Sequence, residues 1–243
     1  MGILHSFIAE ERGRFCMKDN NLFAFSLGQV ARYREFLVVI EARQQEASRK
    51  FIANLNELRV AFPAQAGSMT DNQNHLLEEN SALTNLLHLE IESFYVFAKI
   101  LLDKIARATE FYFGQARSKP LDSHDDLVKN FTSYAKEKSL TTPDGFLNIA
   151  KSLKRDISDF RDYEIAHEKS PRSVKGTGFS PDGSTSMISL KIFPKEGDHQ
   201  ICSQPIVDLL KEVDRFIDVL IELFRANREQ TRLKPDESHG RSG

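Results

Sequence analysis

The feature that most constrains the fold is a pair of long segments that lack proline and whose apolar residues recur at helical spacing. From about Leu22 to Phe62 the only helix-breaking residue is Gly28. Apolar residues recur along this segment at intervals that place them on one face of an α-helix. They are Phe23, Leu27, Val30, Leu37, Ile40, Phe51, Leu55, Leu58 and Phe62. The segment is therefore predicted to be one long helix.

The second long segment runs from about Asp71 to Phe113 and is expected to stop at Gly114, because glycine readily adopts the left-handed conformation that ends helices. Its apolar residues form one stripe, and its polar residues gather on the opposite face. The polar residues are His88, Glu92, Lys99, Asp103 and Glu110. Pro63 to Ser68 is rich in Ala and Gly and is typical of a turn. A long helical hairpin is therefore predicted over about residues 22–114.

The C-terminal part, about residues 122–229, is predicted to contain three shorter helices. The first covers about Asp125 to Lys138. The second begins at Thr142-Pro143-Asp144, a favourable helix start, and reaches about His167. The third covers about Gln204 to Arg228 and has a strong apolar stripe.

One β-hairpin is predicted near residues 173–193, where two strand-like segments flank the turn residues Pro181-Asp182-Gly183-Ser184. Residues 231–243 are polar and are predicted to be a disordered tail. The expected fold is mainly α: a single elongated antiparallel helical bundle over residues 1–243 with one small β-hairpin insertion. The alternative is a long N-terminal helix pair that dimerises, followed by a separate C-terminal bundle.

Composition excludes several classes of protein. The formal charge of -2, from 33 basic and 35 acidic residues, gives no global field of the kind found in dedicated nucleic-acid-binding proteins, so any RNA contact must be local. Cys16 and Cys202 are the only cysteines, which argues against a disulfide framework or a structural zinc site and fits the cytoplasm. Lys99, Asp103 and Lys104 interrupt the most apolar run, so no membrane-spanning helix is expected. No cofactor and no metal site is predicted.

One short motif stands out, Arg161-Asp162-Tyr163-Glu164-Ile165-Ala166-His167. An arginine followed by a histidine at similar spacing also occurs at Arg117 to His124 and at Arg232 to His239. Arg161 differs from these because Asp162 follows it directly, because it ends a predicted amphipathic helix, and because another strongly apolar helix comes next.

This motif resembles that of HEPN domains, small helical bundles in which an Arg, usually followed by Asn, Asp or His, precedes a His by four to six intervening residues. The resemblance would cover about Leu76 to Arg228. It implies a metal-independent ribonuclease that acts as a dimer with the two motifs meeting at the interface, as in toxin or defence proteins. Some members of the superfamily have lost activity and serve as binding modules.

The resemblance implies a role for each residue of the motif. Cleavage of RNA by its own 2′-hydroxyl needs a base with a pKa near neutral and a fixed cation for the developing phosphorane charge. His167 would be the general base or acid, Arg161 the phosphate clamp, and Asp162 the group that orients one of them. Glu90 and Glu164 are supporting candidates, since Glu90 interrupts the apolar stripe of its helix and a bond to Arg161 or His167 would satisfy it. Three basic residues are expected to contact phosphate: Lys169, Arg172 and Lys175.

A non-catalytic role accounts for the same residues. Projected on an ideal helix, Arg161 and His167 lie about 120° apart, so convergence on one phosphate would need a second copy or a frayed helix end. Glu164 and His167 project onto the apolar stripe, where each could be satisfied internally. The alternative function is a helical interaction or scaffold protein of unknown partner. The expected partners are therefore a second copy, RNA, and an antitoxin or other protein, with no membrane.

Overall fold

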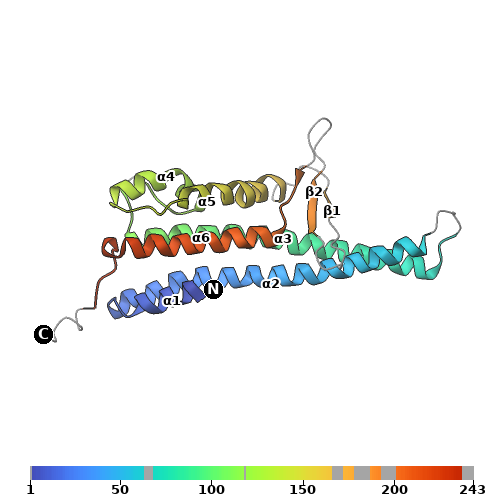
Figure 1. Ribbon diagram of the computed structural model, residues 1–243, viewed down its shortest axis with the longest axis horizontal. Helices are drawn as coiled ribbons and strands as arrows, with labels where there is room; N and C mark the ends of the chain where they lie inside the picture. Colours follow the sequence, from blue (N-terminus) through green and yellow to red (C-terminus); the bar gives the residue numbers. More distant parts are fainter. Residues whose placement is uncertain are drawn as a thin grey trace. The chain divides into compact units, whose positions relative to one another are not determined.

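The computed structural model describes residues 2–62, 68–117, 119–165, 172–177, 187–192 and 201–236. These residues are mainly helical, which confirms the predicted fold class at that level (Figure 1). The chain forms two compact units. Unit 1 comprises Met1–Leu37, Phe97–Asp159 and Leu209–Gly243, and unit 2 comprises Val38–Val96 and Phe160–Asp208. A single domain over residues 1–243 stays a prediction.

The two long helices are α2 (Met17–Ala61) and α3 (Asp71–Phe113), and their bounds confirm the two predicted helical segments. α2 begins somewhat earlier than predicted. α3 ends as predicted, because Gly114 has a φ of 85° and its N–H donates to the Glu110 carbonyl at 2.7 Å. Of the turn predicted at Pro63 to Ser68, residues 63–67 lie outside the described residues.

Unit 1 is built around an aromatic core that includes a helix the sequence analysis did not predict, α1 (Gly2–Arg12). Phe7 of α1 packs against Phe23 of α2, with ring centroids 6.1 Å apart, and against Phe224 of α6 (Ile206–Ala226) at 5.7 Å. Tyr112 of α3 stacks on Phe224 at 4.6 Å. Burying each phenylalanine ring contributes roughly 2–3 kcal/mol, so α1, α2, α3 and α6 share one strongly stabilised core.

The prediction of a disordered tail is wrong for residues 231–236. The short helix η3 (Arg228–Gln230) is followed by an extended segment whose backbone is hydrogen-bonded to the end of α3 and to the connection between α1 and α2. The bonds run from Arg232 N–H to the Tyr112 carbonyl (3.0 Å), from Cys16 N–H to the Lys234 carbonyl (2.9 Å) and from Asp236 N–H to the Arg14 carbonyl (3.0 Å). Leu233 is buried in this segment. Backbone hydrogen bonding and one buried leucine hold a segment whose composition is polar.

Two shorter helices of unit 1 follow α3. α4 (His124–Glu137) matches the helix predicted at about residues 125–138. It begins after the N-cap Ser123, whose Oγ accepts a hydrogen bond from the Asp126 N–H at 3.2 Å. α5 (Phe146–Leu153) follows Gly145, which has a φ of 80°.

The helix predicted to reach about His167 is confirmed as far as Ile165, the last described residue before a gap, but it is not α-helical throughout. After Leu153 the backbone continues as two π-helical segments, η1 (Lys154–Asp159) and η2 (Arg161–Ile165). In a π-helix, hydrogen bonds join residues five apart. Lys154 and Asp159 are five apart, and the Lys154 Nζ lies 2.5 Å from the Asp159 Oδ1, so this ion pair bridges one wide turn. The projection of Arg161 and Glu164 on an ideal α-helix therefore does not apply.

Unit 2 contains the adjoining halves of the two long helices, residues 38–61 of α2 and 71–96 of α3. The buried apolar side chains of this part are Ile40, Ala47, Phe51, Leu76, Leu83, Leu87, Ile91, Phe94 and Tyr95. Asn54 is also buried; its Nδ2 donates to the Leu76 carbonyl at 3.1 Å, and its Oδ1 accepts from the Asn80 Nδ2 at 2.9 Å. These amide contacts connect one position of α2 to one turn of α3 and so fix how the two helices align.

The described residues of unit 2 also form three strands in the order β1-β2-β3. β1 (Arg172–Thr177) and β2 (Met187–Ile192) pair antiparallel, with Arg172 opposite Ile192 and Thr177 opposite Met187. β3 (Ile201–Cys202) pairs antiparallel with β2. The turn predicted at Pro181 to Ser184 lies outside the described residues, so the predicted hairpin connection stays a prediction.

No helix in the described ranges is long and apolar enough to cross a membrane.

Candidate functional site

The motif singled out in the sequence lies at the π-helical segment η2 of unit 2. Arg161 and Asp162 begin this segment, and the Arg161 Nη1 donates to the Asp162 Oδ1 at 2.6 Å. Their side chains are 36% and 38% exposed, so the ion pair is reachable from solvent. The guanidinium uses one of its donors in this contact, and a planar fork of this kind can bind a phosphate with two parallel hydrogen bonds.

Phe160, the residue before the motif, anchors the motif to α3 within unit 2. Phe160 stacks on the buried Tyr95 of α3, with ring centroids 4.7 Å apart and an interplanar angle of 29°. Such a stacked pair adds about 1 kcal/mol beyond the burial of its area. Phe160 is thus held against α3, while the next two residues along the chain present a charged pair.

The remaining motif residues are only partly within the described residues. His167 and Lys169 lie outside them. For Glu164, Arg172 and Lys175 the structure describes the backbone alone, in η2 for Glu164 and in β1 for the two basic residues. The predicted convergence of Arg161 and His167 therefore stays a prediction.

Glu90 has a different partner from the one expected. Its carboxylate is buried, with the side chain 2% exposed, and the Nη2 of Arg43 lies 2.5 Å from the Glu90 Oε1. Arg43 belongs to α2 and its own side chain is 60% exposed. A buried carboxylate needs a cation or hydrogen bonds to offset its lost hydration. Arg43 supplies the cation without any contribution from Arg161, and a bond to His167 falls outside the described residues.

The contact between Arg161 and Asp162 has a near duplicate six residues earlier in the chain. Arg155 and Asp156 are also neighbours in sequence, and the Arg155 Nε lies 2.7 Å from the Asp156 Oδ1. The Arg155 side chain is 72% exposed, and the hydrogen bond to Asp156 raises its pKa. No histidine follows Arg155 at the motif spacing. The Arg-Asp contact alone therefore does not distinguish Arg161, and Arg155 provides a matched control for it.

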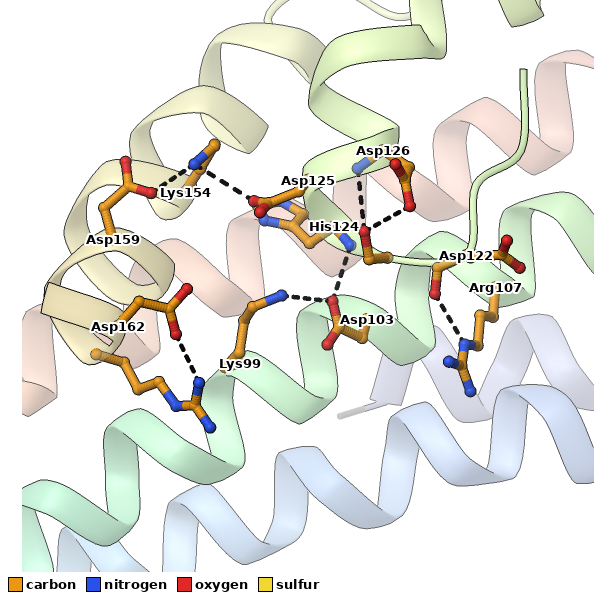
Figure 2. Close-up of polar contacts among 12 residues, drawn as sticks. Lys99, Asp103, Arg107, Asp122, His124, Asp125, Asp126, Lys154, Asp159 and Asp162 are labelled. Atoms are coloured by element: carbon orange, nitrogen blue, oxygen red, sulfur yellow. Dashed lines mark hydrogen bonds and ion pairs between the residues drawn. The ribbon is translucent and has the colours of Figure 1, made fainter. Parts of the chain in front are cut away.

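A second charged cluster, which the sequence analysis missed, surrounds His124 in unit 1. Figure 2 shows it at the start of α4, facing α3 and η1. The Asp103 Oδ1 accepts from the backbone N–H of His124 and from the Lys99 Nζ, each at 2.8 Å. On the far side of His124, Lys154 of η1 lies 3.4 Å from the Asp125 Oδ1. The face of α3 predicted to be polar and solvated thus supports α4 here.

His124 is fully buried, and neither ring nitrogen has a hydrogen-bond partner among the described residues. Its ring packs edge-on against Phe216 of α6, with centroids 5.9 Å apart. Its pKa is lowered from 6.5 to about 4, chiefly by burial and also by the charges of Lys99 and Lys154, while Asp103 and Asp125 act in the opposite direction. His124 is therefore neutral at pH 7 and sits in the core as an aromatic side chain.

The sequence contained part of the signal for this cluster. Lys99 and Asp103 stand four residues apart on α3, a spacing that favours an ion pair on a helix, and Ser123 followed by Asp126 is typical of a helix start. The burial of His124 depends on how α4 packs against α6, which local spacing does not encode.

The described residues contain no group of three or more His, Cys, Asp or Glu side chains that could hold a metal ion. Comparison of the chain with protein-family models, with curated proteins and with solved structures finds no match.

Proposed function

We propose that the chain is a HEPN-like, metal-independent endoribonuclease that acts as a dimer in the cytoplasm, as a toxin or defence effector. The observation that carries this proposal is the partly exposed Arg161 guanidinium, which lies 2.6 Å from Asp162 at the start of a π-helical segment. The fold proposed with it is an elongated antiparallel helical bundle with a β-hairpin insertion. A partner protein such as an antitoxin would hold the enzyme inactive.

Exposure of Arg161 supports a role in binding phosphate. A guanidinium fully used in internal ion pairs, or closed off from solvent, could not reach a phosphate in RNA. At 36% exposure the Arg161 side chain is accessible, while Asp162 restricts its orientation. A held but accessible cation is suited to stabilise charge that develops during the reaction.

The π-helical backbone also supports a functional role at this position. Wide turns of this kind inside α-helices occur frequently at functional sites. They give up regular α-helical hydrogen bonding and change the direction in which the following side chains point. Such a change in direction offers one route by which His167, six residues after Arg161, could approach the same phosphate.

The proposed reaction is transfer within the RNA chain. His167 takes the proton of the 2′-hydroxyl, the 2′-oxygen attacks the adjacent phosphorus, and the P–O5′ bond breaks. The products are a 2′,3′-cyclic phosphate and a 5′-hydroxyl. His167 of one copy of the dimer donates the proton that the leaving 5′-oxygen takes up. Arg161 stabilises the phosphorane charge, and the basic residues Lys169, Arg172 and Lys175 bind neighbouring phosphates.

The test is cleavage of single-stranded RNA and tRNA by the purified protein in EDTA. The expected products carry 2′,3′-cyclic phosphate ends, and 2′-O-methylated RNA is expected to stay intact because it lacks the attacking hydroxyl. His167→Ala should lower the cleavage rate by about 100-fold or more, the usual loss on removing a general acid or base. Arg161→Ala should lower it similarly, with Arg161→Lys recovering part of the loss.

Arg155→Ala is the matched control, since Arg155 makes the same contact with the aspartate that follows it. It should keep wild-type activity. Circular dichroism must first establish that all variants are folded. Equal loss of activity in Arg155→Ala and Arg161→Ala would refute a specific role for Arg161, and a wild-type protein that cleaves no RNA in the panel would refute the ribonuclease proposal.

A second candidate function is a non-catalytic helical interaction or scaffold protein. Exposed apolar side chains on the helices of unit 2 favour it, because monomeric proteins rarely leave clusters of large apolar residues in water. Most of the exposed large apolar residues in the described part of the chain belong to unit 2, on its helices or beside their ends: Val39, Leu55, Val60, Phe62, Met69, Leu77, Leu86, Leu89 and Val207.

A further inference from the structure

Within unit 2, an open groove of about 510 Å³ runs between α2 and α3. Apolar side chains from both helices line it: Val39, Ala42 and Ala47 from α2, and Leu86 from α3. Val39 and Ala42 are three residues apart and so lie on one side of α2. Val39 is 53% exposed and Leu86 is 37% exposed. The small side chains of Ala42 and Ala47 leave room for a ridge of side chains from another helix to enter.

The charged side chains of the groove balance each other. Arg43 and Lys50 supply two positive charges, and Glu46 and Glu90 supply two negative charges. Three of the four are largely exposed: the side chains of Arg43, Lys50 and Glu46 are 60%, 62% and 50% exposed. Glu90 is buried at the base of the groove against Arg43. The groove therefore has apolar and charged side chains but no net charge.

We propose that this groove binds the same groove of a second copy of the chain. A two-fold interface brings one surface against itself, so its charges must be self-complementary. The exposed Glu46 and Lys50 meet this condition, because Glu46 of one copy can face Lys50 of the other, while Arg43 is paired with the buried Glu90 of its own copy. A polyanion such as RNA, or a strongly charged peptide, gains no net attraction from a neutral groove. Charge complementarity thus selects a second copy as the occupant.

Apolar burial supplies the driving force for this association. Covering Val39 and Leu86, together with the neighbouring Leu89, which is 57% exposed, removes large apolar surface from water in each copy. The interface lies on a different set of residues from Arg161 and Asp162, and it is inferred without reference to RNA cleavage. The oligomeric state and the ribonuclease activity are therefore tested separately.

A charge-swap experiment tests the proposal. Glu46→Lys leaves the groove with a net charge of +2, and Lys50→Glu leaves it with -2, so each variant should repel its own copy. Sedimentation equilibrium should show the wild-type chain of 27.7 kDa forming dimers, and each variant alone should show a dissociation constant raised at least tenfold. An equimolar mixture of the two variants should dimerise again, since the altered grooves now attract each other.

Lys129→Glu, at an exposed position of α4, is the control for a charge reversal outside the groove and should dimerise as the wild type does. Circular dichroism confirms that the variants are folded. A wild-type chain that stays at 27.7 kDa over the whole concentration range overturns the proposal. So do variants that dimerise as tightly as the wild type, or a mixture that stays as weak as its components.

Discussion

Burial of His124 makes the stability of the folded chain sensitive to mild acid. In the unfolded chain a histidine has a pKa near 6.5, whereas burial in the core lowers the pKa of His124 to about 4. Between these values the unfolded chain binds a proton that the folded chain does not. Stability therefore rises with pH across this window: the contribution is fully present above pH 6.5 and is lost as pH falls toward 4.

The two pKa values set the size of this effect. At pH 7 His124 is almost fully deprotonated in both states, and the pKa difference lowers the free energy of unfolding by roughly 0.2 kcal/mol. At pH 5 this histidine is protonated in the unfolded chain, which lowers the free energy of unfolding by roughly 2 kcal/mol. Protonation of His124 should thus lower the free energy of unfolding by about 2 kcal/mol between pH 7 and pH 5. The groups that face the ring are Lys99 and Asp103 of α3, Asp125 of α4 and Lys154 of η1, and their opposing effects on the pKa of His124 are smaller than that of burial.

The assay is urea unfolding of wild type and His124→Phe at pH 7 and pH 5, followed by circular dichroism. The substitution keeps an aromatic ring beside Phe216 and breaks no side-chain hydrogen bond, since neither ring nitrogen has a partner among the described residues. The quantity compared is the change in the free energy of unfolding between pH 7 and pH 5, not the absolute stability of the variant. The pH-dependent loss should be about 2 kcal/mol smaller in the variant than in the wild type. Equal losses in the two proteins, or an NMR titration of His124 near pH 6.5 in the folded wild type, would refute the reasoning.

Three further predictions concern buried charges and the C-terminal segment. The buried Glu11 of α1 has the Arg228 Nε 2.8 Å from its Oε1 and keeps Arg14 and Tyr112 as partners, so Arg228→Met should cost about 2 kcal/mol in urea unfolding. Arg225→Met, which loses a contact with the exposed Glu10, should cost less than about 1 kcal/mol. Leu233→Ala should lower the free energy of unfolding by at least about 2 kcal/mol because Leu233 is buried, whereas Lys234→Ala should change it by less than about 0.5 kcal/mol because Lys234 contacts its neighbours through its backbone. Glu90→Gln should leave RNA cleavage unchanged while altering stability, because its carboxylate lies against Arg43; a cleavage defect at full stability would contradict this assignment.

The long helices were predictable because their signal is local and repeated. Apolar spacing over forty or so residues specifies α2 and α3, and Gly114 gives the end of α3 through its own backbone preference. α1 has the same kind of spacing, with Leu4, Phe7 and Glu11 buried on one face. The carboxylate of Glu11 interrupts the apolar pattern of this face. It is buried because Arg14, Arg228 and the hydroxyl of Tyr112 contact it.

The segments that could not be predicted depend on contacts far away in sequence. Residues 231–236 are held by backbone bonds to Tyr112 and to the segment between α1 and α2, and a backbone acceptor leaves no mark on composition. The π-helical turns occur where Lys154 forms an ion pair with Asp159 and where Phe160 stacks on Tyr95. Either of these contacts would fit an ordinary amphipathic pattern, so the sequence indicates a regular helix where the structure has a wide one.

The charged and amide groups that lie between helices share one physical role, which is to fix how the helices align. Residues with this role are no longer candidates for catalysis. An apolar stripe allows two long helices to slide or rotate with little loss of burial, whereas a buried polar group must meet its partner at one position. Asn54 meets Leu76 and Asn80 in this way, Arg43 meets Glu90, and Asp103 meets the first residue of α4. These groups are accounted for by the alignment of helices. The Arg161 and Asp162 pair is different, because both partners are neighbours on one helix and their contact aligns nothing. Arg155 and Asp156 form the same kind of pair, so the contact alone does not assign a function to Arg161, and comparing Arg155→Ala with Arg161→Ala tests whether Arg161 has one.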